Sequence, residues 1–213
     1  MKTIAPSILA ADLLNLGREI EKIENSGAQY VHIDIMDGVF VPNISYGMPV
    51  ISSVRKATDL VLDVHLMITK PNRYFKEFIS CGADIITFHL ESLAENEIVE
   101  ACNYIHSEGK KVGISIKPNT PASELFPYLD MVDMVLIMTV EPGFGGQSFM
   151  VSTMEKVKEI RKRKPNLDIE VDGGINKETI KIANEAGANI FVLGTAFFKS
   201  EGLLTVKELL DEK

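Results

Sequence analysis

The chain has 213 residues, a length typical of one large domain or two small ones. With 46% hydrophobic and 24% charged residues, it has enough apolar material for a sizeable core, which excludes the disordered and fibrous classes. The formal net charge is −8, and no block of lysine and arginine stands out. We therefore expect neither nucleic acid nor an anionic membrane among its partners.

Few features of the sequence point to an oxidising compartment or a membrane. The two cysteines, Cys81 and Cys102, do not have metal-type spacing, and Asp12 precedes any apolar run long enough for a signal peptide. No stretch approaches the roughly 20 continuous apolar residues of a membrane-spanning helix. No linker rich in serine, glycine or proline divides the chain. We expect a cytoplasmic protein in which residues 1–213 form a single domain.

Short apolar runs alternate with helix-like segments along the chain. The predicted strands are residues 4–9, 30–35, 61–67, 85–89, 112–116, 134–138, 169–171 and 190–193. The clearest predicted helices are residues 13–25, 72–81, 95–107, 150–163 and 177–186. Glycine follows four of these helices, as is typical of helix C-termini, at Gly27, Gly82, Gly109 and Gly187.

This alternation predicts an α/β fold with a parallel sheet and right-handed crossovers. The length allows about 27 residues for each strand and helix pair, which is near the lower limit for such a unit. Eight units favour closure into a (β/α)8 TIM barrel, although periodicity alone does not distinguish a barrel from an open doubly wound sheet. In a barrel, the chemistry lies where the strands end at their C-terminal rim.

Polar side chains share one face of the second predicted strand. Because side chains alternate along a strand, His32, Asp34 and Met36 point to one side, and the apolar residues between them point to the other. The apolar face suits packing under helices, so we expect His32 and Asp34 to point into the barrel. A buried carboxylate there requires a partner, because desolvating it without compensation costs several kcal/mol.

Two other strands bring similar residues to the same rim. The alternation places Asp63, His65 and Met67 on one face of the third strand, and the seventh strand ends in Asp172. Two imidazoles and two carboxylates converging at one rim favour a divalent-metal site for Zn²⁺, Fe²⁺, Mn²⁺ or Co²⁺ rather than Ca²⁺.

The alternative is that each of these groups is a satisfied polar residue of the core, and for any one of them alone that interpretation is the better one. That interpretation is weaker for two imidazoles and two carboxylates that lie at equivalent depth. His89, also at a strand end, is interpreted as lying behind the ligands, and His106, late in a predicted helix, as a surface residue.

Glycines gather in the loops after the last three strands, which predicts a phosphate site because glycine lets backbone amides approach an anion. The residues are Gly143, Phe144, Gly145 and Gly146, then Gly173 and Gly174, then Gly194 and Thr195. The alternative is that these are turn glycines only. Position and glycine content also make residues 140–147 the best candidate for a lid.

Smaller residues near the rim complete the candidate site. Met36, Met67 and Met138 lie at or just after strand ends, where they either fill the core or form a water-excluding floor beside a planar intermediate. Ser7, at the end of the first run, either contacts a ligand or caps the next segment.

Several of these segments together resemble the ribulose-phosphate 3-epimerase family. They are APSILAAD at 5–12, HIDIMDG at 32–38 with FVPN at 40–43, DVHLM at 63–67, MTVEPGFGGQ at 138–147 and VDGGI at 171–175. The resemblance runs in the family's order from about Ile4 to Phe198. Departures are small: Gly194-Thr195 stands where Gly-Ser is common, and Gly47-Met48-Pro49 where Gly-Pro-Pro is frequent.

The resemblance implies a barrel of the ribulose-phosphate-binding type, one divalent metal ion per subunit, and a small-molecule sugar phosphate as substrate. The implied activity is the interconversion of D-ribulose 5-phosphate and D-xylulose 5-phosphate in the pentose phosphate pathway. Homo-oligomers are common in the family, so we expect one here. The related allulose-6-phosphate 3-epimerases tend to vary the Asp-Gly-Gly-Ile motif and the glycine-rich loop, whereas this chain keeps both in the pentose form.

The family's functional residues fall on the positions already singled out. The implied metal ligands are His32, Asp34, His65 and Asp172, and the implied acid/base pair is Asp34 and Asp172. The implied substrate contacts are Ser7, His65, Asp172 and the phosphate loops, with Gly143, Phe144, Gly145, Gly146, Gly173, Gly174, Gly194 and Thr195.

Inverting the carbon beside a ketone requires a proton to leave one face and another to arrive on the opposite face, so two acid/base groups must flank a planar 2,3-enediolate. Asp34 and Asp172, on different strands, suit these roles. Two rival functions are a lyase of the decarboxylase or aldol type, for which Lys117 is the candidate lysine, and a non-catalytic sugar-phosphate binder.

Overall fold

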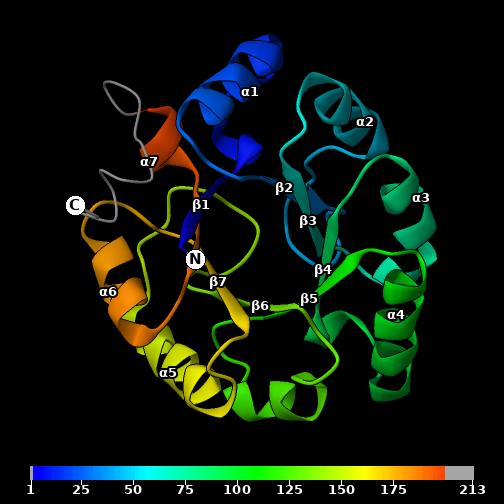
Figure 1. The fold of residues 1–213 in the computed structure, drawn as a ribbon, viewed down its shortest axis with the longest axis vertical. Helices are drawn as coiled ribbons and strands as arrows, with labels where there is room; N and C mark the ends of the chain where they lie inside the picture. The colour runs from blue at the N-terminus through cyan, green and yellow to red at the C-terminus, as the bar shows by residue number, and fades with distance from the viewer. Residues whose placement is uncertain (1, 200–213) are drawn as a thin grey trace.

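The computed structural model describes residues 2–199 and has eight parallel strands surrounded by helices (Figure 1). The strands pair in the order β1-β8-β7-β6-β5-β4-β3-β2. A parallel bridge between Ser7 and His32 connects the two ends of this sheet. The predicted (β/α)8 barrel is therefore confirmed, and the open doubly wound sheet is excluded.

The elements alternate along the described chain as the sequence predicts. The strands are β1 (Thr3–Pro6), β2 (Tyr30–Met36), β3 (Val61–Met67), β4 (Ile85–His89), β5 (Lys111–Ile116), β6 (Met134–Met138), β7 (Asp168–Asp172) and β8 (Ile190–Leu193). The α-helices are α1 (Leu16–Asn25), α2 (Met48–Ala57), α3 (Phe75–Ser80), α4 (Glu95–Ser107), α5 (Met154–Arg163), α6 (Thr179–Ala186) and α7 (Thr195–Phe198).

Short 3-10 helices account for most differences from the predicted bounds. They are η1 (Ile8–Ala10), η2 (Leu13–Asn15), η3 (Pro71–Arg73), η4 (Leu90–Ser92), η5 (Ala122–Tyr128) and η6 (Val151–Thr153). The first strand ends at Pro6 rather than residue 9, because the Ser7 side chain accepts from the Leu9 N–H and begins η1. Three predicted helices likewise begin with 3-10 turns before α1, α3 and α5, and α6 begins at Thr179 rather than residue 177.

The alternation implies a helix between the second and third strands, although α2 is not among the helices predicted by residue range. Its sequence, MPVISSVRKA, has β-branched residues and serines in its body, which lower helix propensity, whereas the proline lies in the first turn, where it is tolerated. Tertiary packing overrides that preference, because Ile51 and Val54 are buried against the barrel.

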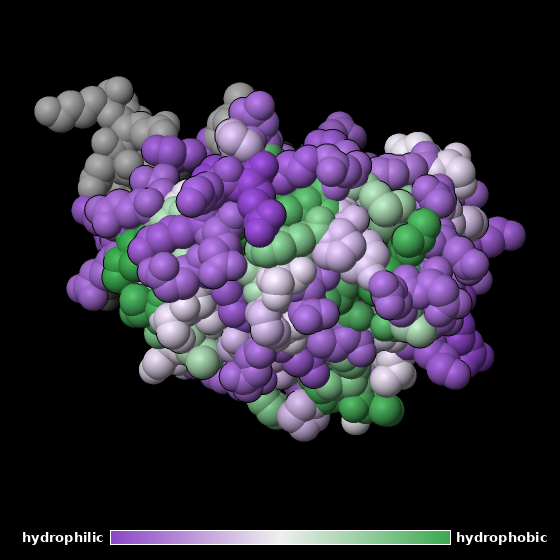
Figure 2. Space-filling view, turned by 90° about the horizontal axis from the view of Figure 1, so that it is seen from below, coloured by the Kyte–Doolittle hydropathy of each residue, from purple (hydrophilic) through white to green (hydrophobic). Residues whose placement is uncertain are grey.

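The apolar faces of the strands pack outward under the helices. Val31, Ile33 and Ile35 of β2 belong to the main hydrophobic core, as the alternation predicted. The face of the molecule in Figure 2 is mainly hydrophilic, with hydrophobic side chains in scattered patches. Among residues 2–199, no helix combines the length and the apolar character needed to cross a membrane.

The strand register sets the depth of the polar inward residues. His32 is paired with Asp63, Asp34 with His65, and the last pair of these two strands is Met36 with Met67. Asp172, the last residue of β7, is paired with Met138 at the end of β6. Polar side chains from separate parts of the sequence are thereby brought to the C-terminal rim.

Candidate active site

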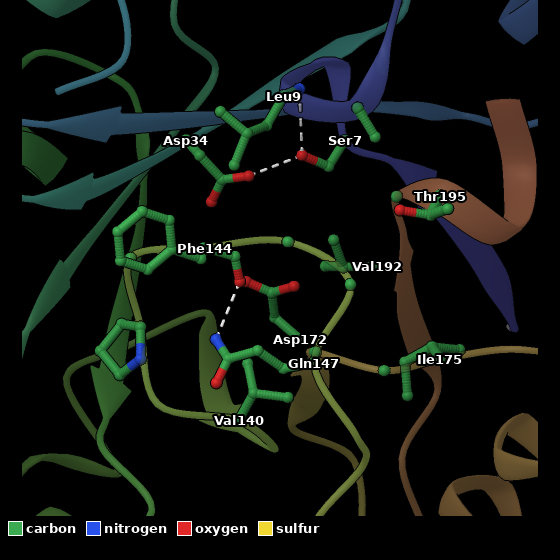
Figure 3. A pocket seen from close by; sticks show the side chains of 18 of the residues that line it. Ser7, Leu9, Asp34, Val140, Phe144, Gln147, Asp172, Ile175, Val192 and Thr195 are labelled. Carbon is green, nitrogen blue, oxygen red and sulfur yellow. Dashed lines mark hydrogen bonds between the residues drawn. The ribbon is translucent and has the colours of Figure 1, made fainter. Parts of the chain in front are cut away.

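A cavity of about 380 Å³ opens at the C-terminal rim of the barrel (Figure 3). Most of the predicted site residues line it: Ser7, Asp34, Met36, Met67, Met138, Gly143, Phe144, Gly145, Gly146, Asp172, Gly173, Gly174, Gly194 and Thr195. His32 and His65 do not line it, because they lie wholly buried and in contact with Asp34. The structure thus brings all the predicted residues together around one cavity.

Two histidines and two aspartates form a compact cluster at the cavity floor. His32 Nε2 and His65 Nδ1 each lie 3.2 Å from Asp34 Oδ1. The same two nitrogens lie 3.9 Å and 3.8 Å from Asp172 Oδ2. One ligand atom from each of the four residues lies within 4.8 Å of the other three, so these residues could hold a single metal ion.

The carboxylate of Asp63 orients the His32 ring through its Nδ1 atom. Asp63 Oδ2 lies 2.6 Å from His32 Nδ1, and Thr87 Oγ1 donates to Asp63 Oδ1 at 3.3 Å. Because an ionised carboxylate only accepts hydrogen bonds, Nδ1 of His32 donates, and the other ring nitrogen faces Asp34 and Asp172. Gly113 makes room for this arrangement, since a Cβ there would lie 2.3 Å from Thr87 Oγ1.

Glu170 of β7 is a further buried carboxylate, and the sequence reasoning did not single it out. Both its oxygens are buried without a hydrogen-bond partner, and Oε1 lies 3.6 Å from His32 Nδ1. The signal was available, because the alternation that directs Asp172 inward also directs Glu170 inward. Buried oxygens without a partner are rare in folded proteins, and Glu170 places such a carboxyl directly beside His32.

The pKa values of the two aspartates in the cluster are shifted in opposite directions. Burial and the negative charge of Asp34 raise the pKa of Asp172 to about 6. Burial acts in the same direction on Asp34, but His32 and His65 outweigh it and lower the pKa of that carboxyl.

Neighbouring carboxylates also shift the pKa values of the buried His32 and Glu170. Burial alone would lower the pKa of His32, yet the carboxylates of Asp34, Asp63 and Glu170 raise it well above its ordinary value. Burial and the charge of Asp63 raise the pKa of Glu170. The carboxylates therefore favour a positive charge at this point, whether a proton or a metal ion.

The donor set fits a divalent transition metal. Two imidazole nitrogens and two carboxylate oxygens suit Zn²⁺, Fe²⁺, Mn²⁺ or Co²⁺ better than Ca²⁺, which prefers oxygen ligands alone. The second ring nitrogen of His32 is held by a carboxylate, the arrangement that commonly orients metal-binding histidines. The four predicted ligands could therefore hold such an ion, and His32 has the supporting contact that metal-binding histidines commonly make.

Ser7 caps the next segment, which is one of its two predicted roles, and its contact with a ligand stays a prediction. Its hydroxyl donates to Asp34 Oδ2 at 2.6 Å and accepts from the Leu9 N–H at 3.3 Å (Figure 3). The same side chain therefore caps η1 and stabilises the ionised form of a site aspartate.

The glycine-rich loops form the side of the cavity opposite β2 and β3. Gly174 has φ 66°, and a Cβ there would lie 2.6 Å from the backbone nitrogen of Phe149, so only glycine fits. The Asn43 side-chain amide donates to Gly143 O at 2.7 Å and links this loop to the one after β2. Glycines of these loops line the cavity at this end, where a phosphate site is predicted.

The methionines lie at the depth that the sequence predicted. Met36 and Met67 pack together with Val41, and Met138 packs with Val140. All three methionines border the cavity while being almost completely buried. Their side chains make part of the cavity lining apolar.

The remaining histidines and Lys117 lie outside the cavity lining. His89 is buried, and its Nε2 lies 2.9 Å from Nε2 of His65, so it lies behind a predicted ligand as expected. His106 pairs with Asp133 at the surface, as expected. The Lys117 ammonium lies 3.9 Å from the centroid of the Phe40 ring. It is not among the residues lining the cavity, so the lysine named for the lyase alternative does not border this site.

Comparisons of the sequence with known proteins agree on one family. The sequence profile described as the ribulose-phosphate 3 epimerase family matches residues 3–198. A rice protein (Oryza sativa subsp. japonica) named "Ribulose-phosphate 3-epimerase, cytoplasmic isoform" is 48% identical over 200 residues, covering 92% of this chain and 86% of its own. A Bacillus subtilis (strain 168) protein named "Ribulose-phosphate 3-epimerase" is 44% identical over 226 residues, covering 100% of both chains.

Solved structures show the same fold at lower identity. A 3-hexulose-6-phosphate synthase superposes with a TM-score of 0.70 and 21% identity, covering 98% of both chains. At that identity the likeness concerns the barrel alone.

Proposed function

Because this chain belongs to the ribulose-phosphate 3-epimerase family and is an epimerase of that kind, we propose that it interconverts D-ribulose 5-phosphate and D-xylulose 5-phosphate by a two-aspartate mechanism. The reaction inverts C3 of the sugar phosphate through a 2,3-enediolate. It belongs to the pentose phosphate pathway.

The observation that supports the mechanism is the pair of aspartates, on separate strands, that border one cavity. One of the two, in its ionised form, is the base that removes the C3 proton, and the other, in its protonated form, is the acid that delivers a proton to the opposite face. The two groups exchange roles in the reverse reaction. Ser7 supports the ionised form of Asp34 through its 2.6 Å hydrogen bond.

The metal of the site is one divalent ion per subunit, held by His32, Asp34, His65 and Asp172. When bound, such an ion acts as a Lewis acid, which lowers the pKa of the carbon acid and stabilises the negative charge that develops on oxygen. The candidate ions are zinc, iron, manganese and cobalt.

The other parts of the cavity position the substrate. Backbone amides of the loops after β6, β7 and β8 bind the phosphate, at Gly143, Phe144, Gly145, Gly146, Gly173, Gly174, Gly194 and Thr195. Met36, Met67 and Met138 exclude water beneath the planar intermediate, and the segment 140–147 closes over it. We propose further that residues 1–213 form one domain and that the chain is a cytoplasmic homo-oligomer, a location for which the name of the rice relative gives a precedent.

The test is a coupled assay that follows xylulose 5-phosphate formed from ribulose 5-phosphate. It uses metal-stripped protein with Zn²⁺, Fe²⁺, Mn²⁺ and Co²⁺ restored separately, and allulose 6-phosphate as a competing substrate. We expect metal-dependent turnover that favours the pentose. Absence of turnover on either sugar phosphate with metal fully bound would contradict the proposal.

Single variants Asp34→Asn and Asp172→Asn test the roles of the two carboxylates. Each should lose at least roughly 10² to 10⁴ in turnover, because each removes one general acid/base group. Near-normal turnover in both variants would show that the two-aspartate mechanism is wrong.

A further inference from the structure

Three side chains form a hydrogen-bonded chain that leads away from the proposed metal site. His65 Nε2 lies 2.9 Å from His89 Nε2, and His89 Nδ1 lies 3.3 Å from Glu91 Oε2. The ring centroids of the two histidines are 5.0 Å apart with their planes inclined by 24°. Since their nitrogens are much closer than their centroids, the rings meet edge to edge, the geometry of a hydrogen bond between imidazoles.

The position of each proton in this chain follows from Glu91. An ionised carboxylate only accepts, so Nδ1 of His89 donates to it, and Nε2 of a neutral His89 is then an acceptor. That acceptor requires Nε2 of His65 to carry a proton. The remaining nitrogen of His65, Nδ1, faces Asp34 and Asp172 and is left free to bind a metal.

We propose that Glu91 is a positioning residue that, through His89, fixes the tautomer of His65 in which Nδ1 binds the metal. The proposal rests on the metal site of the proposed function and assigns a role to a residue outside that cavity. In this arrangement Glu91 orients His65 through His89, as Asp63 orients His32 directly.

Glu91 is itself held in one orientation. Its Oε1 accepts from the Lys117 backbone N–H at 2.8 Å and from the hydroxyl of Thr120, so only Oε2 is left for His89. The loop carrying these donors is tied to α5 by the Lys156 ammonium, which donates to three of its carbonyls at 2.6 to 3.0 Å.

The histidines of the chain are enclosed. The side chains of His65 and His89 are 0% exposed, whereas that of Glu91 is 24% exposed. Water therefore has little access to the ring nitrogens to replace a lost partner. The direction of each hydrogen bond has to be set by the side chains themselves.

This arrangement predicts an unusual effect of Glu91→Gln. The amide oxygen should face the two donors on the loop, Lys117 N–H and the Thr120 hydroxyl, which leaves the amide NH₂ facing His89. His89 Nδ1 would then have to accept and its Nε2 to donate. His65 would be forced to carry its proton on Nδ1, where it blocks the metal.

The experiment measures Zn²⁺ binding to the full chain by competition with a chromophoric chelator, together with long-range proton–nitrogen NMR spectra of its four histidines. We expect Glu91→Gln to weaken zinc binding about 10- to 100-fold and to move the His89 proton from Nδ1 to Nε2. His106, which pairs with Asp133 at the surface, serves as an internal reference in the spectra.

Three further variants separate this role from a structural one. Thr120→Ala loosens the loop but leaves the carboxylate facing His89, and Glu124→Gln removes an exposed charge from the next segment; both should keep the zinc affinity of the wild type. His89→Gln should bind zinc more tightly than Glu91→Gln, because an amide can accept from His65 and donate to Glu91 at once.

The outcomes are distinct. Three results would overturn the inference while the metal site stands. The first is a Glu91→Gln variant that binds zinc as tightly as the wild type, and the second is a His89 proton that stays on Nδ1. The third is a Thr120→Ala variant that loses as much zinc affinity as Glu91→Gln. Failure of the wild-type chain to bind zinc, iron, manganese or cobalt would instead overturn the proposed metal site, and the inference with it.

Discussion

Replacing Asp172 by asparagine should make the metal-free chain more stable while abolishing turnover. Asp172 has a pKa raised from 3.8 to about 6, with burial as the main cause and the charge of Asp34 as the next. In the absence of a metal, the folded state therefore favours the protonated carboxyl. The isosteric amide of Asp172→Asn carries no charge at any pH and escapes that penalty.

The sign and size of the effect follow from linkage. Because the folded pKa lies above the unfolded one, the contribution of Asp172 is fully present below about pH 4 and is lost as the pH rises through about 6. A shift of about two units at 1.36 kcal/mol each amounts to about 3 kcal/mol. The stability of Asp172→Asn relative to wild type should rise by up to that amount between pH 4 and 6 and stay level above it.

The assay is urea unfolding at a series of pH values on chelator-treated protein. Glu155→Gln is the matched control, because it removes a carboxylate that is 72% exposed and should change stability by less than about 0.5 kcal/mol at every pH. Zinc at a hundred times its dissociation constant should then stabilise the wild type by about 2.7 kcal/mol and Asp172→Asn by less. A wild-type to variant difference that stays constant from pH 4 to 7 would refute the reasoning.

Two other substitutions test neighbouring contacts. Ser7→Ala removes a donor to the charged Asp34, so kcat/KM should fall roughly 10- to 100-fold without loss of the fold by circular dichroism; an unchanged kcat/KM would show that the hydrogen bond is unimportant. Gly174→Ala forces a side chain onto a left-handed backbone beside Phe149 N, so Tm should fall and KM for the sugar phosphate should rise; normal values of both would contradict the role of this loop.

The cluster of site residues was predictable because two simple periodicities determine it. Alternation along a strand directs His32, Asp34, His65 and Asp172 inward, and parallel strands end at the same rim. Nothing more than strand identification is needed for that prediction. The sequence could not indicate that both histidines are completely buried, since burial depends on how the barrel closes.

The supporting carboxylates were harder to predict. Glu91 lies in η4, where no strand periodicity constrains its direction, and its donors come from the loop after the next strand. Contacts between loops depend on tertiary structure, and local sequence pattern does not reveal them. The first strand is shorter than predicted, and helix α2 forms despite its low helix propensity, for a related reason. Capping by Ser7 and burial of Ile51 outweigh the local preferences of these two segments.

The most direct test of the two-aspartate mechanism follows the C3 proton during a single turnover in deuterium oxide. If Asp34 and Asp172 act from opposite faces, the proton removed by one is not the proton delivered by the other. The xylulose 5-phosphate formed from ribulose 5-phosphate should therefore carry deuterium at C3, as read by mass spectrometry. Product that retains the original protium would show that a single group removes and returns the proton, and would contradict the mechanism.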